Sequence, residues 1–305
     1  MTGPVRRARR YLSRPDVGQA PWRLAARRLV YEAERHVAPS RLERERCVGY
    51  DGDLRIWVRP ADVVDRDIYL YGAHEYVTAT VFGHLARPGD VVVDAGAHIG
   101  AFTLLAAHRV GPAGKVLAFE PNPLQRDRLA RNVATNGLAQ VDVRAEALSD
   151  HDGRALLHLS DDETRSGNAS LAAGHGSAGA VPVDLIRLDD LRDLLGLGCV
   201  DLIKLDVEGA EADVIAGASA TIDACRPAIV FEVNDLGPAG DGATAPAIEA
   251  LRSLGYSLYG MGLDATGAPS LTEVGPGEDP SPHREAWHAL NLLALHPAGD
   301  RALVG

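Results

Sequence analysis

The sequence predicts an α/β fold in which a mostly parallel sheet is covered by helices on both faces. Two patterns lead to this prediction: short apolar segments that often end in an acid, and helical stretches between them. Strands as apolar as these are typical of parallel sheets buried on both sides. The last two expected strands come close together without a long helix between them, so we expect a hairpin ending with one antiparallel strand.

The expected elements alternate from about residue 89 onward. In chain order we expect strands over 91–94, 115–120, 141–147, 200–206, 228–233, 256–261 and 289–295, and helices over 102–110, 122–136, 211–224 and 245–254. Gly, Ala, Ser and Pro are frequent in three intervening segments, 160–180, 235–246 and 264–282, which we interpret as loops.

Composition excludes several classes of protein. The chain has 305 residues, 46% of them hydrophobic, and a formal net charge of −11, which argues against a general binder of nucleic acid or anionic membranes. No segment approaches the roughly 18 apolar residues of a spanning helix, and the first residues do not resemble a signal peptide. Three cysteines without a CxxC motif indicate no disulfide framework, so a reducing cytoplasm is the expected location.

Charge is distributed unevenly along the chain. Residues 1–46 hold 12 Arg, no Lys and 5 acids, a net of +7, so residues 47–305 carry −18. The segment 22–37 has the apolar spacing of an amphipathic helix. We therefore divide the chain into a basic Arg-rich helical extension, 1–46, and a main domain, 47–305. The extension either packs on the main domain or docks to a partner.

The first candidate site follows the strand at 91–94. The string DAGAHIG at 94–100 places Asp94 at the strand end and glycines at 96 and 100 before a helix. Glycines let the backbone approach a ligand, but this spacing is not the GxGxxG that holds a pyrophosphate. A carboxylate at this position suits a ligand with an ammonium or hydroxyl group better than a phosphate.

Glu120 ends the next strand, where an acid can accept both hydroxyls of a ribose. Together with the glycine loop it indicates a nucleoside that has a cationic amino-acid tail and no phosphate. S-adenosylmethionine has this chemistry, so we expect it as the cofactor.

A third candidate site is the string KLDVEGAE at 204–211. On a strand, Lys204 and Asp206 share one face, and Asp206 and Glu208 then lie at its carboxyl end, where an acceptor meets the donor. Two neighbouring carboxylates can bind the acceptor, take its proton or shift each other's pKa. Alternatively, Glu208 caps the next helix and Lys204 only neutralises a buried acid.

Metal dependence is left open by these acids. Asp206, Glu208 and Glu232 could gather around a divalent ion, since carboxylates suit Mg²⁺. The ligand set is incomplete by sequence, so we expect no metal.

The segment 69–234 resembles the FkbM family of S-adenosylmethionine-dependent methyltransferases. The resemblance is carried by GAHE at 72–75, RPGDVVVDAGAHIGAFT at 87–103, VLAFEPNP at 116–123, AEALSD at 145–150, LIKLDVEGAE at 202–211 and PAIVFEVN at 227–234. It implies the Rossmann-like class I methyltransferase fold, with a seven-stranded, mostly parallel sheet whose last strand is antiparallel. It also implies O-methylation of a hydroxyl, often on a sugar or a secondary metabolite.

We assign roles to individual residues as a mechanistic hypothesis. Asp206 is expected to be the base or the hydrogen-bond partner of the acceptor, with Lys204 and Glu208 beside it. For the cofactor, we expect Gly96 and Gly100 to give the donor room, Asp94 to lie at its amino-acid tail and Glu120 at its ribose. Asn122 and Ala147 are expected beside the adenine, and Glu75 is expected to close the pocket. His98, which replaces the usual Asn of the family, is the last expected cofactor-binding residue. Asn168 and Ser170 either face the acceptor or belong to a non-binding loop.

Other functions are weighed against this one. A nicotinamide oxidoreductase needs the missing GxGxxG, and a nucleic-acid methyltransferase needs a basic body and an aromatic-Pro motif after the fourth strand. A non-catalytic S-adenosylmethionine-binding module and N-methylation stay open, as does homo-oligomerisation. The expected partner is a small-molecule hydroxyl acceptor.

Overall fold

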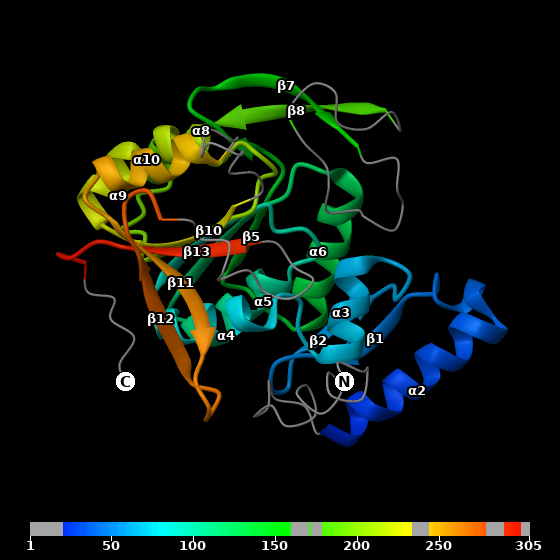
Figure 1. Cartoon of the computed structure of the whole chain (residues 1–305). Helices are drawn as coiled ribbons and strands as arrows, with labels where there is room; N and C mark the ends of the chain where they lie inside the picture. Colours follow the sequence, from blue (N-terminus) through cyan, green and yellow to red (C-terminus); the bar gives the residue numbers. More distant parts are fainter. Residues whose placement is uncertain (1–20, 160–170, 172–178, 234–243, 279–289, 300–305) are drawn as a thin grey trace.

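The chain is built around one eight-stranded sheet (Figure 1). In this computed structural model the described residues are 21–159, 171, 179–233, 244–278 and 290–299. Five neighbouring strands of the sheet are parallel, in the order β5 (Val141–Arg144), β4 (Lys115–Phe119), β3 (Val91–Ala95), β9 (Leu202–Leu205) and β10 (Ala228–Val233). The carboxyl ends of these strands therefore meet at one edge, as the predicted fold class requires.

The antiparallel end of the sheet differs from the prediction by one strand. β13 (Leu290–Leu295) lies between β10 and β11 (Ser257–Leu263) and is antiparallel to both, which confirms the predicted antiparallel last strand. β12 (Pro269–Val274) adds an eighth strand at the edge, inside the segment that we expected to be a loop. Most β12 residues are exposed or half-buried, so this strand lacks the apolar run that predicted the others.

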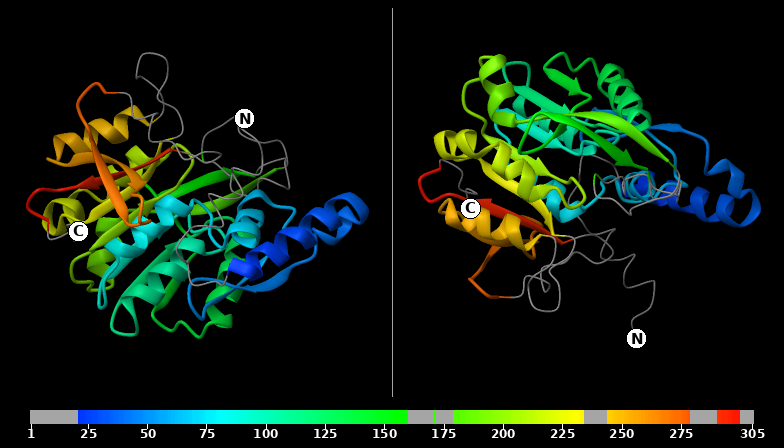
Figure 2. Two further views of the ribbon diagram at one scale, coloured as in Figure 1. Left: turned by 60° about the horizontal axis from the view of Figure 1, so that its bottom comes forward. Right: turned by 90° about the horizontal axis from the view of Figure 1, so that it is seen from above.

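Helices cover both faces of the sheet (Figures 1 and 2). One face carries α4 (Tyr76–Leu85), α5 (Ala101–Val110) and α6 (Pro123–Thr135). The other face carries α7 (Leu188–Leu194), α8 (Glu211–Gly217), α9 (Ser219–Cys225) and α10 (Ala245–Ser253). The single helix expected over 211–224 is thus two helices that meet at Ala218.

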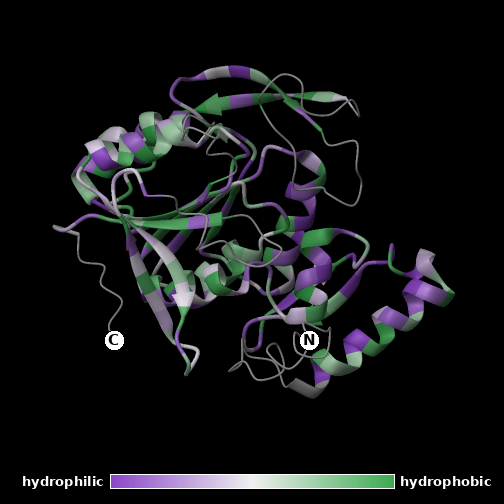
Figure 3. Ribbon diagram, in the orientation of Figure 1, coloured by the Kyte–Doolittle hydropathy of each residue, from purple (hydrophilic) through white to green (hydrophobic). Residues whose placement is uncertain are grey.

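Alternation along the strands divides the core into two layers. Val92 packs in the core under α4 and α5, whereas its neighbour Val93 packs in the core under α8 and α9. Figure 3 shows hydrophobic residues concentrated in these central strands, whereas hydrophilic and hydrophobic residues are mixed along the helix α2 (Pro21–Val37). Because side chains alternate with a period of two, Asp94 belongs to the same face as Val92. Polar residues at the strand ends therefore replace apolar ones on the α4/α5 face.

The residues before β3 form elements that the sequence did not predict, apart from the first helix. They are α2 (Pro21–Val37), a short 3-10 helix (Pro39–Arg41), the hairpin β1 (Arg46–Gly49) and β2 (Arg55–Val58), α3 (Val63–Tyr71) and the helix α4 already described.

The helix α2 packs against this hairpin and α3. The Arg27 guanidinium donates to the backbone oxygens of Gly49 and Tyr69, both at 3.5 Å. Arg46 pairs with Glu34 at 2.5 Å. The described part of the extension therefore packs on the main domain, and the expected boundary after residue 46 falls one residue into β1. A docking role for residues 1–46 stays a prediction.

A second, three-stranded sheet lies beside the large one. Its order is β6 (Ala147–Leu148), β8 (Ala180–Ile186) and β7 (Gly153–His158). The strand expected over 141–147 was therefore too long, because β5 ends at Arg144 and Ala147 begins β6 in this other sheet. Among the described residues, no helix combines the length and the apolar character needed to cross a membrane.

Candidate active site

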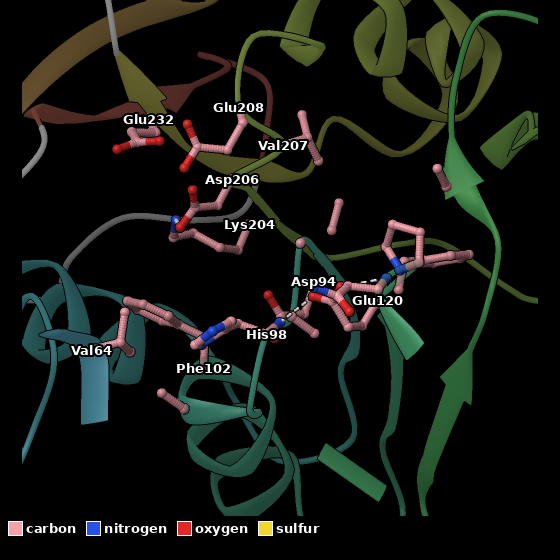
Figure 4. Close-up of a pocket in the computed structure, with 18 of the residues that line it drawn as sticks. Val64, Asp94, His98, Phe102, Glu120, Lys204, Asp206, Val207, Glu208 and Glu232 are labelled. Atoms are coloured by element: carbon pink, nitrogen blue, oxygen red, sulfur yellow. Dashed lines mark hydrogen bonds and ion pairs between the residues drawn. The ribbon is translucent and has the colours of Figure 1, made fainter. Parts of the chain in front are cut away.

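A cavity of about 600 Å³ lies at the carboxyl ends of β3, β4, β9 and β10 (Figure 4). It gathers ten of the eleven residues predicted for the site, which lie far apart in the sequence: Glu75, Asp94, Gly96, His98, Glu120, Asn122, Ala147, Lys204, Asp206 and Glu208. We call the part lined by Gly96, His98, Glu120, Asn122 and Ala147 the glycine-loop end. We call the part lined by Glu75, Lys204, Asp206, Glu208 and Glu232 the carboxylate end.

Glu120 is held by backbone groups at the glycine-loop end. One carboxylate oxygen accepts from the His98 N–H at 2.7 Å and the other from the Asn122 N–H at 2.8 Å. The side chain is only 7% exposed, and burial raises the pKa of Glu120 to about 7. Each oxygen has a second lone pair, so the carboxylate can still accept two hydroxyl groups from a ligand.

The two glycines of the loop have different functions. A Cβ on Gly96 would lie 1.8 Å from the backbone oxygen of Asp206, so this glycine allows the loop to touch the end of β9. Gly96 lines the cavity, but Gly100 does not. A Cβ on Gly100 would lie 2.5 Å from the Leu129 side chain, so the absence of a side chain there lets α5 approach α6. The prediction that Gly100 gives the ligand room is therefore wrong.

Three further predicted residues complete the glycine-loop end. His98 has a left-handed backbone (φ +50°), which turns its N–H toward Glu120, and burial lowers the pKa of its imidazole. The Asn122 side chain accepts from the Leu124 N–H at 3.1 Å and so caps α6. Ala147 gives the cavity an apolar wall with Leu157. Their predicted contacts with a ligand stay predictions.

Asp94 connects the two ends of the cavity. It lies directly opposite Lys204 in the parallel pair of β3 and β9, and both side chains are about 1% exposed. Its carboxylate accepts a 2.6 Å hydrogen bond from the Thr103 hydroxyl. Burial raises the pKa of Asp94 to about 6, although Thr103 and Lys204 oppose this shift.

Lys204 and Asp206 form an ion pair at the carboxylate end, with 3.0 Å between Nζ and Oδ2; the Lys204 side chain is buried and the Asp206 side chain is 32% exposed. The two residues share one face of β9, as predicted, and the ammonium lies 5.0 Å from the centre of the Phe102 ring. Burial opposes ionisation of both groups, but the pair's mutual attraction outweighs it together with Glu75 and Glu232 around Lys204 and with Glu232 and His74 around Asp206. These interactions raise the pKa of Lys204 and lower that of Asp206. Both groups are therefore charged at neutral pH.

Two more carboxyl groups approach Asp206, as Figure 4 shows. Carboxylate oxygens of Asp206, Glu208 and Glu232 all lie within 4.8 Å of one another. Burial raises the pKa of Glu208 to about 7, and burial together with the charges of Asp206 and Glu208 raises the pKa of Glu232. Without a further cation, Glu208 and Glu232 therefore retain protons near neutral pH, whereas Asp206 is ionised.

Glu75 reaches the carboxylate end from the other side of the cavity. It precedes α4 with a left-handed backbone (φ +47°), and its Oε1 accepts from the Asn291 amide at 2.9 Å. Sequence reasoning missed Asn291 and also His74, which lines the cavity. The only sequence signal for Asn291 is one polar residue in the apolar strand 290–295. Asn168 and Ser170 lie outside the described residues.

Comparison with known proteins gives a consistent result. The model of the Methyltransferase FkbM domain family matches residues 94–258. The chain is 34% identical over 203 residues to the 31-O-demethyl-FK506 methyltransferase FkbM of Streptomyces tacrolimicus, covering 56% of this chain and 74% of that protein. It is 31% identical over 155 residues to the 2-O-methyltransferase NoeI of Sinorhizobium fredii, covering 47% of this chain and 63% of that protein.

A third relative is much longer than this chain. The AMB antimetabolite synthetase AmbE of Pseudomonas aeruginosa is 32% identical over 222 residues, and the match covers 59% of this chain but only 10% of that protein. The shared region is therefore a small part of AmbE.

Proposed function

The chain belongs to the FkbM methyltransferase family, and on this premise we propose that it is an S-adenosylmethionine-dependent O-methyltransferase. We propose that its acceptor is a hydroxyl of a small molecule such as a sugar or a secondary metabolite. The observation that carries the proposal is one cavity that holds both Glu120 and the Lys204–Asp206 pair. The names of two relatives describe O-methyltransfer, which supports the same reaction type.

The residues at the glycine-loop end fit S-adenosylmethionine. Glu120 is buried and ionisable and has lone pairs left for two ribose hydroxyls. The apolar wall of Ala147 and Leu157 suits the adenine, and the buried carboxylate of Asp94 suits the ammonium of the amino-acid tail. When bound, the cofactor supplies a methyl group already activated by a positively charged sulfur.

The residues at the carboxylate end act on the acceptor. Lys204 keeps Asp206 ionised and fixes its Oδ2, so Asp206 can accept a hydrogen bond from the acceptor hydroxyl and receive its proton. A positioned base contributes about 10²–10⁴-fold to the rate. Lys204 is therefore a positioning residue, and Asp206 is the residue that we propose contacts the substrate.

We also propose that residues 47–305 form the catalytic body and that it does not act on nucleic acid. The net charge of −18 over these residues would repel a polyanion. A small neutral or cationic acceptor has no such barrier.

Mass spectrometry with a labelled donor tests the proposed reaction. The chain is incubated with a metabolite extract and S-adenosylmethionine that carries a trideuterated methyl group. We expect a labelled product with a new methyl ether, and no label in added RNA or DNA. Binding of the donor without transfer to any molecule would instead indicate a non-catalytic binding module. Label on nitrogen would overturn the assignment to oxygen.

A further inference from the structure

The carboxylate end of the cavity holds more negative than positive charge. Four carboxyl groups line it, those of Glu75, Asp206, Glu208 and Glu232, against the single ammonium of Lys204. Three other basic residues line the cavity. Burial lowers the pKa of the His98 imidazole, and Arg66 and His74 both pair with Asp67, although His74 also attracts Asp206 and Glu75. His74 lies 3.5 Å and Arg66 3.4 Å from the carboxylate of Asp67.

Three buried oxygens at this end have no hydrogen-bond partner among the described residues. They are Glu75 Oε2, Glu232 Oε2 and Asn291 Oδ1, and these residues are 3%, 7% and 5% exposed. Asn291 lies directly opposite Glu232 in the β10–β13 pair, and its amide nitrogen already donates to Glu75. When the two carboxyl groups are ionised, all three atoms are acceptors, which a cation or a hydrogen-bond donor satisfies. A proton shared between Glu232 and Asp206 satisfies Glu232 alone and leaves Glu75 Oε2 and Asn291 Oδ1 without a partner among the described residues.

The acids are close enough together to share one ion. Oxygens of Asp206, Glu208 and Glu232 lie within 4.8 Å of one another, and the three side chains point toward a common space in Figure 4. Divalent cations bind oxygen ligands at about 2.0–2.6 Å, so oxygens around one ion are at most about 5 Å apart. The unpartnered amide oxygen of Asn291 lies on the neighbouring strand, at the position paired with Glu232.

We propose that Asp206, Glu208 and Glu232 bind a divalent cation of the Mg²⁺ class, with Asn291 and Glu75 beside it. The sequence argued against a metal because its ligand set was incomplete. The fold brings Glu232 beside Asp206 and Glu208 and places the unpartnered oxygen of Asn291 on the strand next to Glu232. The ion neutralises the charge that Lys204 leaves unbalanced. A role for the ion in holding the acceptor hydroxyl rests on the proposed function. Binding of the ion to the three carboxylates does not depend on that function.

Electron paramagnetic resonance with Mn²⁺ tests the site on the full chain after treatment with a chelator. We expect one saturable site per chain that Mg²⁺ competes for. Glu232→Gln and Glu208→Gln keep the shape of the side chains and should each weaken Mn²⁺ binding by at least about tenfold. The exposed Asp213 on α8 provides a matched control, and Asp213→Asn should bind Mn²⁺ like the wild type.

Two results would overturn the proposal. One is the absence of saturable Mn²⁺ binding to the wild type up to about 10 mM, beyond the weakest biological calcium sites. The other is wild-type affinity in both Gln variants. Calorimetry with S-adenosylmethionine on the same samples shows that the variants are folded and separates the two proposals. Donor binding without Mn²⁺ binding would refute only the cation site, and a cationic group of the acceptor would then be the partner of these acids. Mn²⁺ binding without donor binding would refute the proposed function and leave the cation site standing.

Discussion

The two ends of the cavity are stabilised in different ways. At the glycine-loop end, backbone N–H groups satisfy both oxygens of Glu120, and a glycine contact fixes the loop against β9. At the carboxylate end, side chains from four separate elements meet, and several of their oxygens lack partners among the described residues. A site made from backbone is complete before its ligand arrives, whereas a site made from like charges needs a ligand to complete it.

The largest effect that distinguishes the ends is expected from Asp206→Asn. Loss of the proton acceptor should lower the rate of methyl transfer by about 10²–10⁴-fold. The affinity for S-adenosylmethionine should change by less than about threefold, because Glu120 lies at the other end. Single-turnover transfer of a tritiated methyl group and calorimetry measure the two quantities. An unchanged rate in Asp206→Asn, or an equal loss in the Asp213→Asn control, would contradict the assignment.

The opposite pattern is expected from Glu120→Ala. Removing an ionised acceptor of two ribose hydroxyls should weaken donor binding by about 10- to 100-fold, since such hydrogen bonds contribute about 1.5–3 kcal/mol. The melting temperature should change much less. Glu146 offers a matched control, because it pairs with Arg144 at 2.6 Å and does not line the cavity. Wild-type affinity in Glu120→Ala would refute the ribose assignment.

Gly96→Ala tests the contact that joins the two ends. The new methyl group would meet the Asp206 backbone oxygen, which no side-chain rotation can relieve. We expect a loss of about 1–3 kcal/mol in the free energy of unfolding, measured with urea. Gly137→Ala is the control, because that residue has a similar left-handed backbone and nothing within 4 Å of the added Cβ. Equal losses in both variants would mean that backbone strain, not the contact, sets the cost.

The smallest effect is a dependence of donor affinity on pH. Glu120 must be ionised to accept both hydroxyls, and its pKa is raised to about 7. The carboxylate therefore gains its proton as the pH falls through 7, so affinity should fall by about tenfold between pH 8 and pH 6. Calorimetry at several pH values measures this, and Glu120→Gln should show no such slope. The same slope in that variant would assign the titration to another group, such as Asp94.

The central parallel strands β3, β4, β9 and β10 could be predicted from sequence because each is a mostly buried, mostly apolar run, whereas β5 at the edge is half-buried. The strand ends then located Asp94, Glu120 and Asp206 at one edge of the sheet. The same reasoning missed β12 and the β7–β8 pair, because most residues of these three strands are exposed or half-buried and form no apolar run. It also assigned Gly100 to the ligand, because spacing alone does not show whether a glycine faces a cavity or another helix.

The carboxylate end could be predicted only in part. Lys204, Asp206 and Glu208 are close in sequence, so one strand is enough to bring them together. Glu75 and Asn291 are 216 residues apart and meet only because β13 inserts beside β10. This placement depends on sheet topology, which the periodicity of a single segment does not encode.

The position of β13 has a consequence for folding in time. This strand comes after all the others in the chain but lies in the interior of the sheet, between β10 and β11. During synthesis, the β10 edge that faces β13 therefore stays without a paired strand until residues 290–295 have left the ribosome. The β11–β12 hairpin cannot join the sheet before then, because β11 pairs with the sheet through β13. Contacts across such long sequence separations form slowly. Glu232 thus meets Asn291 only after residues 290–295 have been synthesised, so the Asn291–Glu75 contact beside the carboxylate end forms later than the parallel part of the sheet.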